Sequence, residues 1–133
     1  MNVIKSKHLQ LLLSAIIVFV VSFIYGGHPE KWLPTIFNFE VQNLELKNIF
    51  RAIMGLYLAF ALYWALGIKN ERYWAGATIS NIVFMGGLAF GRLISTLFDG
   101  WSTQFGIGMV LEFFMMLWGI WNLKTFENTR NTN

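Results

Sequence analysis

The chain contains no cysteine. This excludes disulfide bonds, thiolate metal sites and a cysteine nucleophile. It contains only two histidines, His8 and His28, and both lie outside the apolar segments, so we expect neither a bis-histidine haem nor a histidine-rich metal site. Charged residues make up 13% of the chain, about half of the roughly 25% typical of soluble domains. These absences favour lipid over water as the main solvent of this protein.

Basic residues are not clustered, although the formal net charge is +3. They fall in loops and near helix ends, without a basic stripe or a recognition motif, so no nucleic-acid partner is expected. Contact with anionic membrane lipids accounts for the positive balance better. We therefore expect membrane lipids as the first partners of the chain.

Four apolar segments dominate a sequence that is 56% hydrophobic over 133 residues. They predict helices at about 9–26, 49–68, 73–98 and 104–124, each long enough to cross a hydrocarbon core of roughly 30 Å. The first lacks an A-x-A cleavage signal, so we interpret it as a retained helix and not as a signal peptide. The short connections predict an all-α, integral membrane four-helix bundle, and the length predicts one domain over 1–133.

The distribution of lysine and arginine predicts the orientation of the chain. With both termini inside, the inner side collects Lys5, Lys7, Lys69, Arg72, Lys124 and Arg130, whereas the outer side has Lys31, Lys47, Arg51 and Arg92. This modest bias favours an N-in, C-in arrangement.

The connection 28–47 mixes apolar and charged residues, and Pro29 and Pro34 preclude one long regular helix. One interpretation places it along the membrane interface with Trp32 at headgroup depth. The other has it pack against the helix ends, where it would cover a pocket.

Ionisable residues within the apolar spans are the candidate site. Arg92 follows nineteen uncharged residues, Tyr73–Gly91, and Glu112 stands alone in the last span. Such groups are costly in lipid and face protein or water. Arg92 lies about 26 Å from the inner boundary and Glu112 about 16 Å, with side chains that lean toward each other. An ion pair between them is therefore expected.

Four more residues complete the predicted ligand site. Ser95 and Asp99 share a helical stripe with Arg92, Arg51 begins the second span, and Tyr57 lies deeper in that span. Two arginines and one deep carboxylate suit a phosphate or carboxylate headgroup, with apolar walls for the tail of a lipid or quinone-like molecule. The competing interpretation is a structural ion pair that fixes helix register.

Other functions remain open. The chain could be an accessory subunit that docks on a membrane protein partner or on a second copy, or a small proton-linked transporter that uses Glu112. A catalytic role is not favoured: the sequence has no nucleophile–base pair, metal-ligand cluster or phosphate-cradling loop. No cofactor is expected. Gly87 and Gly91 form a G-x-x-x-G pattern before Arg92 and predict close approach of another helix.

The stretch FMGGLAFGRLISTLFDG (Phe84–Gly100) resembles an uncharacterised bacterial family of small four-span membrane proteins, the domain of unknown function DUF4345. Arg51–Leu58 matches its R-x-x-x-G-L-Y-L pattern, and a single Glu112 stands in the last helix. The resemblance implies a bacterial cytoplasmic-membrane protein with a four-helix fold. It marks Arg51, Arg92, Asp99 and Glu112 without assigning them roles. Span count and a small-residue helix face also give a looser likeness to redox-associated proteins of the DoxX type.

Overall fold

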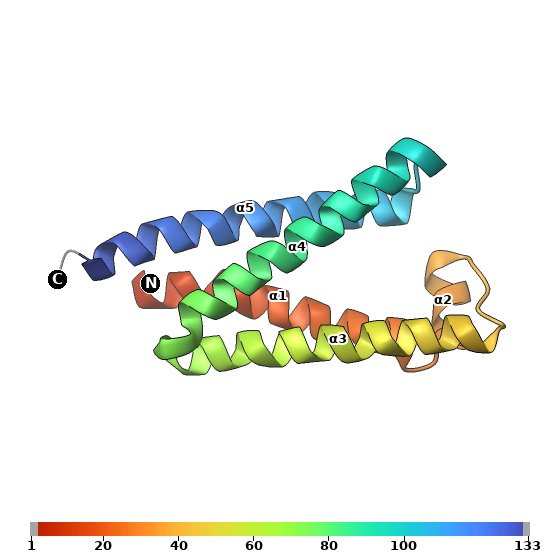
Figure 1. Cartoon of the computed structure of the whole chain (residues 1–133), viewed down its shortest axis with the longest axis horizontal. Coiled ribbons are helices and arrows are strands. Elements are labelled where there is room, and N and C mark those ends of the chain that lie inside the picture. Colours follow the sequence, from red (N-terminus) through yellow and green to blue (C-terminus); the bar gives the residue numbers. More distant parts are fainter. Residues whose placement is uncertain (1–2, 132–133) are drawn as a thin grey trace. The chain divides into compact units, whose positions relative to one another are not determined.

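A computed structural model of the protein describes the backbone of residues 3–131 and the side chains of residues 6–126. These residues form five helices and no strand: α1 (Val3–Gly26), α2 (Pro29–Phe37), α3 (Leu44–Lys69), α4 (Glu71–Asp99) and α5 (Thr103–Asn131) (Figure 1). The prediction of an all-α protein is confirmed.

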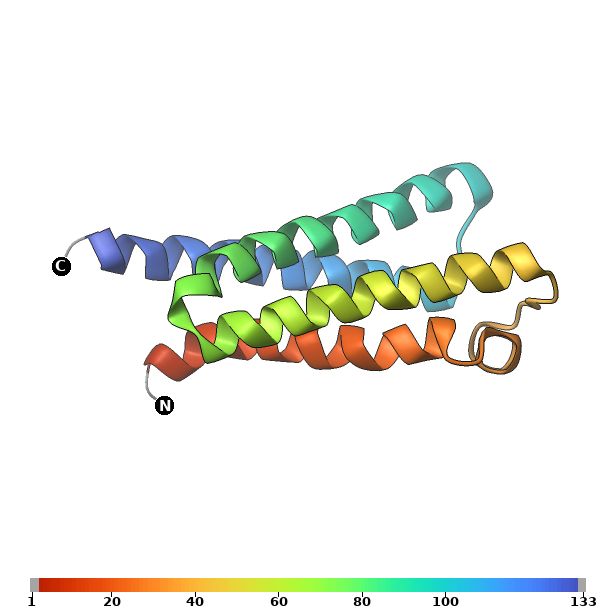
Figure 2. The same ribbon diagram turned by 60° about the horizontal axis from the view of Figure 1, so that its bottom comes forward.

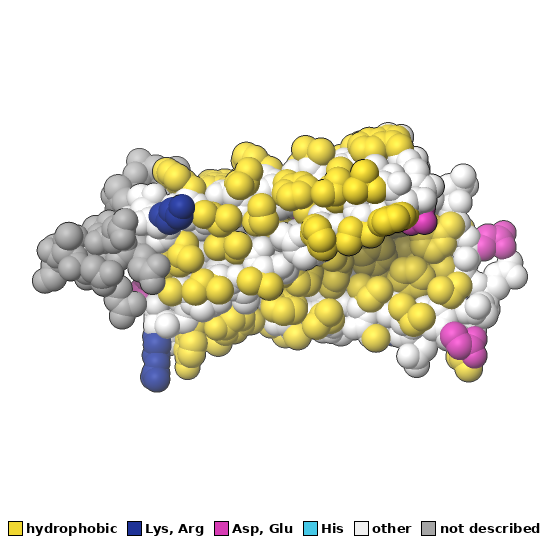
Figure 3. Space-filling view, turned by 45° about the horizontal axis from the view of Figure 1, so that its top comes forward, with side chains coloured by type: hydrophobic (Ala, Val, Ile, Leu, Met, Phe, Trp, Pro, Cys, Tyr) yellow, Lys and Arg dark blue, Asp and Glu magenta, His cyan; other side chains and the backbone are white. Residues whose placement is uncertain are grey.

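Four of the helices are long and apolar enough to cross a membrane. The segments concerned are Ser6–Gly26, Leu44–Lys69, Glu71–Asp99 and Thr103–Phe126. Hydrophobic side chains cover most of the face seen in Figure 3, with few charged groups among them. A surface of this kind is costly in water and suits contact with lipid. The predicted four membrane-spanning helices are thus confirmed.

The long helices extend past the predicted bounds of 9–26, 49–68, 73–98 and 104–124, and local chemistry explains where they end. Asn43 accepts a hydrogen bond from the Leu46 backbone N–H (2.7 Å), and Asn70 accepts one from the Arg72 backbone N–H (3.0 Å). These caps satisfy amides that a helix start leaves open. Gly100 ends α4 with φ +103°, a backbone angle that favours glycine. Neither the stretch 3–8 nor 125–131 contains the proline or glycine that would stop α1 or α5.

The predicted interfacial segment 28–47 contains the short helix α2. Pro29 occupies its first turn, where the missing N–H costs nothing, and Asn38 ends it in the left-handed conformation (φ 58°). The segment is not one long helix, since α2 has nine residues, but Pro34 lies inside α2 and does not break it. Leu33 is buried and Trp32 is exposed. Placement of Trp32 at headgroup depth stays a prediction.

The chain divides into two compact units. We call residues 13–63 the α1–α3 unit; its core is a cluster of aromatic rings. Tyr25 stacks on Phe37 and Phe50 and meets Tyr57 edge to face, with ring centroids 5.8–6.0 Å apart. A Cβ at Gly26 would clash with Met54, so glycine is needed for α1 to pack closely on α3.

The α4–α5 unit comprises residues 1–12 and 64–133. Its helices α4 and α5 lie side by side, as Figures 1 and 2 show. The beginning of α1 joins both: Gln10 bonds to Asn81 of α4 and to a backbone carbonyl of α5. The fully buried Trp64 at the end of α3 donates to Ser80 of α4 (3.1 Å). This unit holds the ion pair, the cavity and the buried amides that are described below.

Candidate functional site

An ion pair between Arg92 of α4 and Glu112 of α5 is the centre of the site. The Arg92 Nε–H donates to both carboxylate oxygens of Glu112, at 2.9 Å and 3.1 Å. The two side chains are only 21% and 13% exposed. Helical side chains lean toward the N-terminus of their own helix, so on antiparallel neighbours these two lean toward each other. The predicted ion pair is confirmed.

Phe105 and Gly108 of α5 position the guanidinium. The Arg92 Cζ lies 5.1 Å from the centroid of the Phe105 ring, within the range of a cation–π interaction. A Cβ at Gly108 would lie 3.6 Å from Arg92 Nε, an ordinary van der Waals distance, so the backbone of Gly108 lies directly against the guanidinium. The first three turns of α5 therefore supply an aromatic face and a counter-charge to one arginine.

A cavity of about 270 Å³ opens beside this arginine. We call it the Arg92 pocket. Seven residues line it, and they come from the end of α4, the following turn and the start of α5: Gly91, Arg92, Ser95, Thr96, Gly100, Ser102 and Phe105. Among them Arg92 alone is charged, and three carry hydroxyl groups; the Ser95 hydroxyl donates its hydrogen to Asp99, which leaves Thr96 and Ser102 as the candidate donors.

Sequence reasoning found Arg92 and Ser95 but missed Thr96, Ser102 and Phe105. A signal existed: Gly100 marks the end of α4, and a short turn must bring the next residues back to the level of Arg92. The hydroxyl and aromatic residues at 102 and 105 could have been proposed on that ground.

The other predicted site residues lie outside the pocket lining. Asp99 is exposed and accepts a hydrogen bond from Ser95 Oγ (2.9 Å), while Glu112 touches the pocket only through its ion pair with Arg92. Arg51 and Tyr57 belong to the α1–α3 unit, where Arg51 is exposed and Tyr57 is buried against Tyr25. Their participation in a shared ligand site stays a prediction.

The described residues of the α4–α5 unit place no helix against the G-x-x-x-G pattern. A Cβ at Gly87 or at Gly91 would meet no atom within 4 Å. Close helix packing uses other glycines of the same unit: a Cβ would clash with Ala77 at Gly67, and would lie 2.8 Å from a Met116 sulfur at Gly86 and 2.8 Å from Ile82 Cγ1 at Gly119. Close approach of another helix to Gly87 and Gly91 stays a prediction, because spacing alone does not say which face of a helix meets a neighbour.

The chemistry available at the Arg92 pocket is that of binding. A guanidinium, hydroxyl groups and the amides at the start of α5 are donors suited to an oxyanion. In the part of the chain that the structure describes, no group of three histidine, aspartate or glutamate side chains gathers as metal ligands.

Four apolar spans with an ion pair between two of them define a multi-pass α-helical membrane protein. Comparison with known families places the chain more narrowly. It belongs to the family described as domain of unknown function DUF4345, which matches residues 7–123. Comparisons with curated proteins and with solved structures give no match.

Proposed function

We propose that the protein binds an amphiphile through an anionic headgroup, a phosphate or a carboxylate, held in the Arg92 pocket. The carrying observation is that Arg92 is the one charged residue among the seven that line this cavity. Three hydroxyl groups accompany it, from Ser95, Thr96 and Ser102. Charge-assisted hydrogen bonds from a guanidinium to such oxyanions are among the strongest in proteins.

The start of α5 also favours a ligand with negative charge. Ser102 directly precedes α5, and its carbonyl accepts the Gly106 backbone N–H (2.7 Å). The amide groups of a first helical turn carry partial positive charge and favour anions nearby. Arg92 and the helix terminus therefore act together on whatever enters the pocket.

The size of the cavity limits what it can hold. Pockets that enclose a drug-sized ligand measure about 300–1,000 Å³, so about 270 Å³ fits a headgroup and not a whole amphiphile. An attached chain would lie outside, along the lipid-facing surface of α4, where Phe90 and Ile94 are exposed. An amphiphile satisfies both regions, whereas a free anion would use only the first.

Asp99 sets the balance of charge at the mouth. It bonds to Ser95, a lining residue, and it brings a negative charge to the edge of the pocket. This charge would weaken anion binding by repulsion. The proposal therefore makes opposite predictions for two neighbours: neutralising Arg92 weakens binding, and neutralising Asp99 strengthens it.

We also propose that the protein resides in a bacterial cytoplasmic membrane, with both termini inside. The lysine and arginine bias described above supports this orientation. It would put the Arg92 pocket at the outer boundary of the membrane, since Trp101, in the turn beside it, is exposed and of the type enriched at interfaces.

Native mass spectrometry of the full-length protein tests the proposal. Wild type, Arg92→Gln and Arg72→Gln proteins are purified identically in a neutral detergent, incubated with one equivalent of a phosphate-headed lipid, and compared for the fraction that retains it. Arg72 is the matched control, an exposed arginine at the opposite end of α4. A fatty acid replaces the phospholipid in a second arm and identifies which oxyanion is preferred.

Retention by wild type and Arg72→Gln, with a loss of about tenfold or more in Arg92→Gln, is the expected result. Equal retention by all three proteins would show that the lipid adheres to the apolar surface, and the proposal would be rejected.

A further inference from the structure

A second polar region lies at the other end of the α4–α5 unit, among side chains that the Arg92 pocket does not use. Gln10 of α1, Asn81 of α4 and Asn122 of α5 are each fully buried, and Thr78 is nearly so. All of them lie within segments that can span a membrane. Because burying an amide without hydrogen bonds is costly in free energy, each of these amides needs partners.

Some of these partners come from the protein. Gln10 Nε2 donates to Asn81 Oδ1 (2.6 Å) and to the Met115 backbone carbonyl (3.1 Å), and thereby links α1, α4 and α5. Asn122 Nδ2 makes a long bond to the Lys7 carbonyl (3.4 Å). We call Gln10, Trp74, Asn81 and Asn122 the amide seam.

Other buried atoms of the amide seam have no protein partner among the described residues. They are the Asn81 Nδ2 and Trp74 Nε1 donors and the Asn122 Oδ1 acceptor. Asn81 and Asn122 are fully buried, and Trp74 is 5% exposed. Unpaired buried groups of this kind are rare in native proteins, and bound water commonly satisfies those that do occur.

The spacing of these residues makes them one region and not scattered defects. Trp74, Thr78 and Asn81 share one face of α4, and Met115, Gly119 and Asn122 share one face of α5. Seven residues of helix cover about 10.5 Å. A Cβ at Gly119 would lie 3.3 Å from Gln10 Nε2, so glycine lets the Gln10 amide sit between the two faces.

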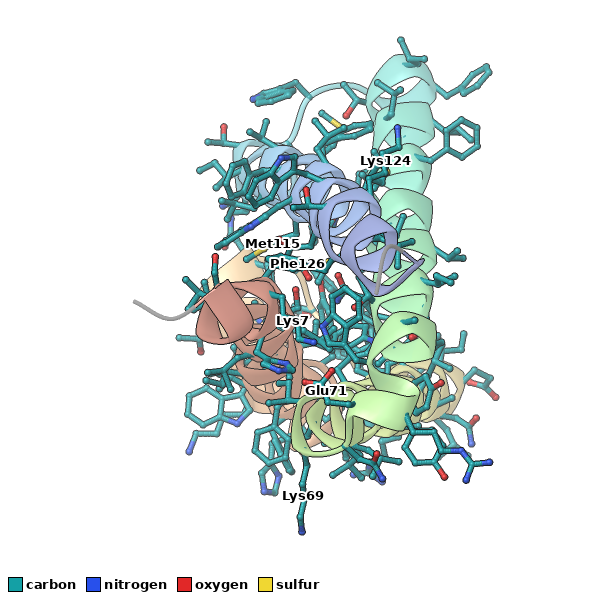
Figure 4. The ribbon with its side chains drawn as sticks, turned by 90° about the vertical axis from the view of Figure 1, so that its left-hand side faces the viewer. Lys7, Lys69, Glu71, Met115, Lys124 and Phe126 are labelled. Atoms are coloured by element: carbon teal, nitrogen blue, oxygen red, sulfur yellow. The ribbon has the colours of Figure 1, made fainter. Side chains whose placement is uncertain are left out.

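Titratable groups stand at the mouth of the amide seam, where Lys7 and His8 Nε2 contact Glu71 and the buried His8 Nδ1 has no partner among the described residues. Lys7 pairs with Glu71 (2.5 Å) and lies 4.9 Å from the Trp74 ring centroid, while His8 Nε2 contacts Glu71 (3.1 Å). Figure 4 shows Lys7 and Glu71 together at this end of the unit, with Lys69 pointing away. Farther in, the side chains are neutral amides, an indole and a hydroxyl.

From these contacts we propose that the amide seam is a binding site for a small uncharged molecule that both donates and accepts hydrogen bonds. The donors of Asn81 and Trp74 need an acceptor, and the Asn122 oxygen needs a donor. A charged ligand would find no counter-charge among these groups and would be costly to bury. Water has this chemistry, and so does the hydroxyl or amide group of a neutral organic molecule.

Two buried tryptophans of the same unit provide a matched comparison. Trp64 Nε1 donates to Ser80, whereas Trp74 Nε1 has no protein partner in the described part of the chain. Full-length protein with ¹⁵N-labelled tryptophan and asparagine is placed in lipid nanodiscs. Hydrogen exchange of the indole N–H groups and cross-relaxation of the Asn81 amide with water are then measured by NMR. Native mass spectrometry of the same protein, and of Asn81→Leu, reports any retained neutral organic molecule.

Exchange at Trp74 about tenfold or more faster than at Trp64, with a water cross-peak at Asn81, is expected if water fills the site. If the Asn81 cross-peak is absent but a neutral organic molecule is retained by wild type and lost in Asn81→Leu, the site stands with that molecule as its ligand. Fast exchange at Trp74 with neither signal at Asn81 means that water reaches only the helix end, and this overturns the proposal. Slow exchange at both tryptophans with neither signal also overturns it.

Discussion

The Arg92–Glu112 ion pair joins two helices through largely buried side chains. Removing either partner leaves the other charge without compensation, which costs up to about 3–5 kcal/mol for buried pairs. We expect Arg92→Ala and Glu112→Ala each to lower the unfolding free energy in detergent by an amount in this range. The double variant should recover part of the lost unfolding free energy, because it leaves neither charge buried without its partner.

Arg72→Ala is the matched control for this double-mutant cycle, since Arg72 is an exposed arginine of the same helix. Its effect should stay within about 0.5 kcal/mol. Strictly additive losses in the Arg92 and Glu112 variants would mean that the two side chains do not stabilise each other.

Gly67 lies on a helix face that packs against a neighbour, whereas Gly87 lies on a face with open space around it. A Cβ at Gly67 would clash with the Ala77 methyl group, which has no rotamer to escape. We expect Gly67→Ala to destabilise the protein by about 1–3 kcal/mol, the cost of overpacking. Gly87→Ala meets nothing within 4 Å and should be neutral or stabilising by up to about 1 kcal/mol.

Thermal unfolding in detergent measures both glycine variants. A loss at Gly87 as large as that at Gly67 would contradict this account, because it would require a close neighbour that the described residues of the α4–α5 unit do not provide.

At the level of elements, α2 offers a pH-dependent contact outside the membrane spans. The pKa of Glu30 lies below its ordinary value, and the largest cause is a backbone hydrogen bond in the first turn of α2. Desolvation raises this pKa, whereas Lys47 and His28 lower it further. A lowered folded-state pKa gives stability that is present above the ordinary pKa and is lost as pH falls through the lowered one.

We therefore expect α2 to be better protected in wild type than in Glu30→Gln at neutral pH, with the difference vanishing in acid. Hydrogen exchange of peptides covering 28–40, read at each pH for both proteins, measures this. A difference that persists unchanged below the lowered pKa would rule out the Glu30 carboxylate as its source.

Some of these elements can be predicted from sequence and others cannot, depending on the kind of sequence pattern that each one requires. The four long helices can be predicted from apolar runs, and the ion pair can be predicted from helix geometry. Both predictions use only the positions of residues along the sequence. The amide seam does not: Gln10 and Asn122 look like ordinary helix residues until α1 and α5 are brought together. The α2 helix was missed because Pro34 within it breaks the usual helical pattern.

For the whole molecule, the four candidate spans among the described residues predict that both ends of the chain lie on the same side of the membrane. The lysine and arginine bias predicts that this side is the cytoplasmic one. Fluorescent-protein fusions at either end, which mature only inside the cell, should both be bright, and alkaline phosphatase at the same ends should be inactive. An active phosphatase at the C-terminus would contradict the predicted orientation.

The chemical class of the ligand is harder to predict from sequence than the orientation in the membrane. Arg51 and Arg92 suggested two converging cations, and this convergence stays a prediction because Arg51 belongs to the α1–α3 unit. The Arg92 pocket depends instead on a turn at Gly100 that brings Ser102 and Phe105 beside the arginine. Hydropathy and charge counts do not predict that this turn brings the start of α5 back beside Arg92.

The central claim is that Arg92 selects an anionic headgroup, and titration calorimetry on protein in neutral-lipid nanodiscs tests it most directly. The ligands are dodecyl phosphate and dodecyl maltoside, which share a tail and differ in charge. Wild type should bind the phosphate about tenfold tighter or more. Arg92→Gln should lose this preference, and Asp99→Asn should increase it. An unchanged preference for phosphate in Arg92→Gln would contradict the account.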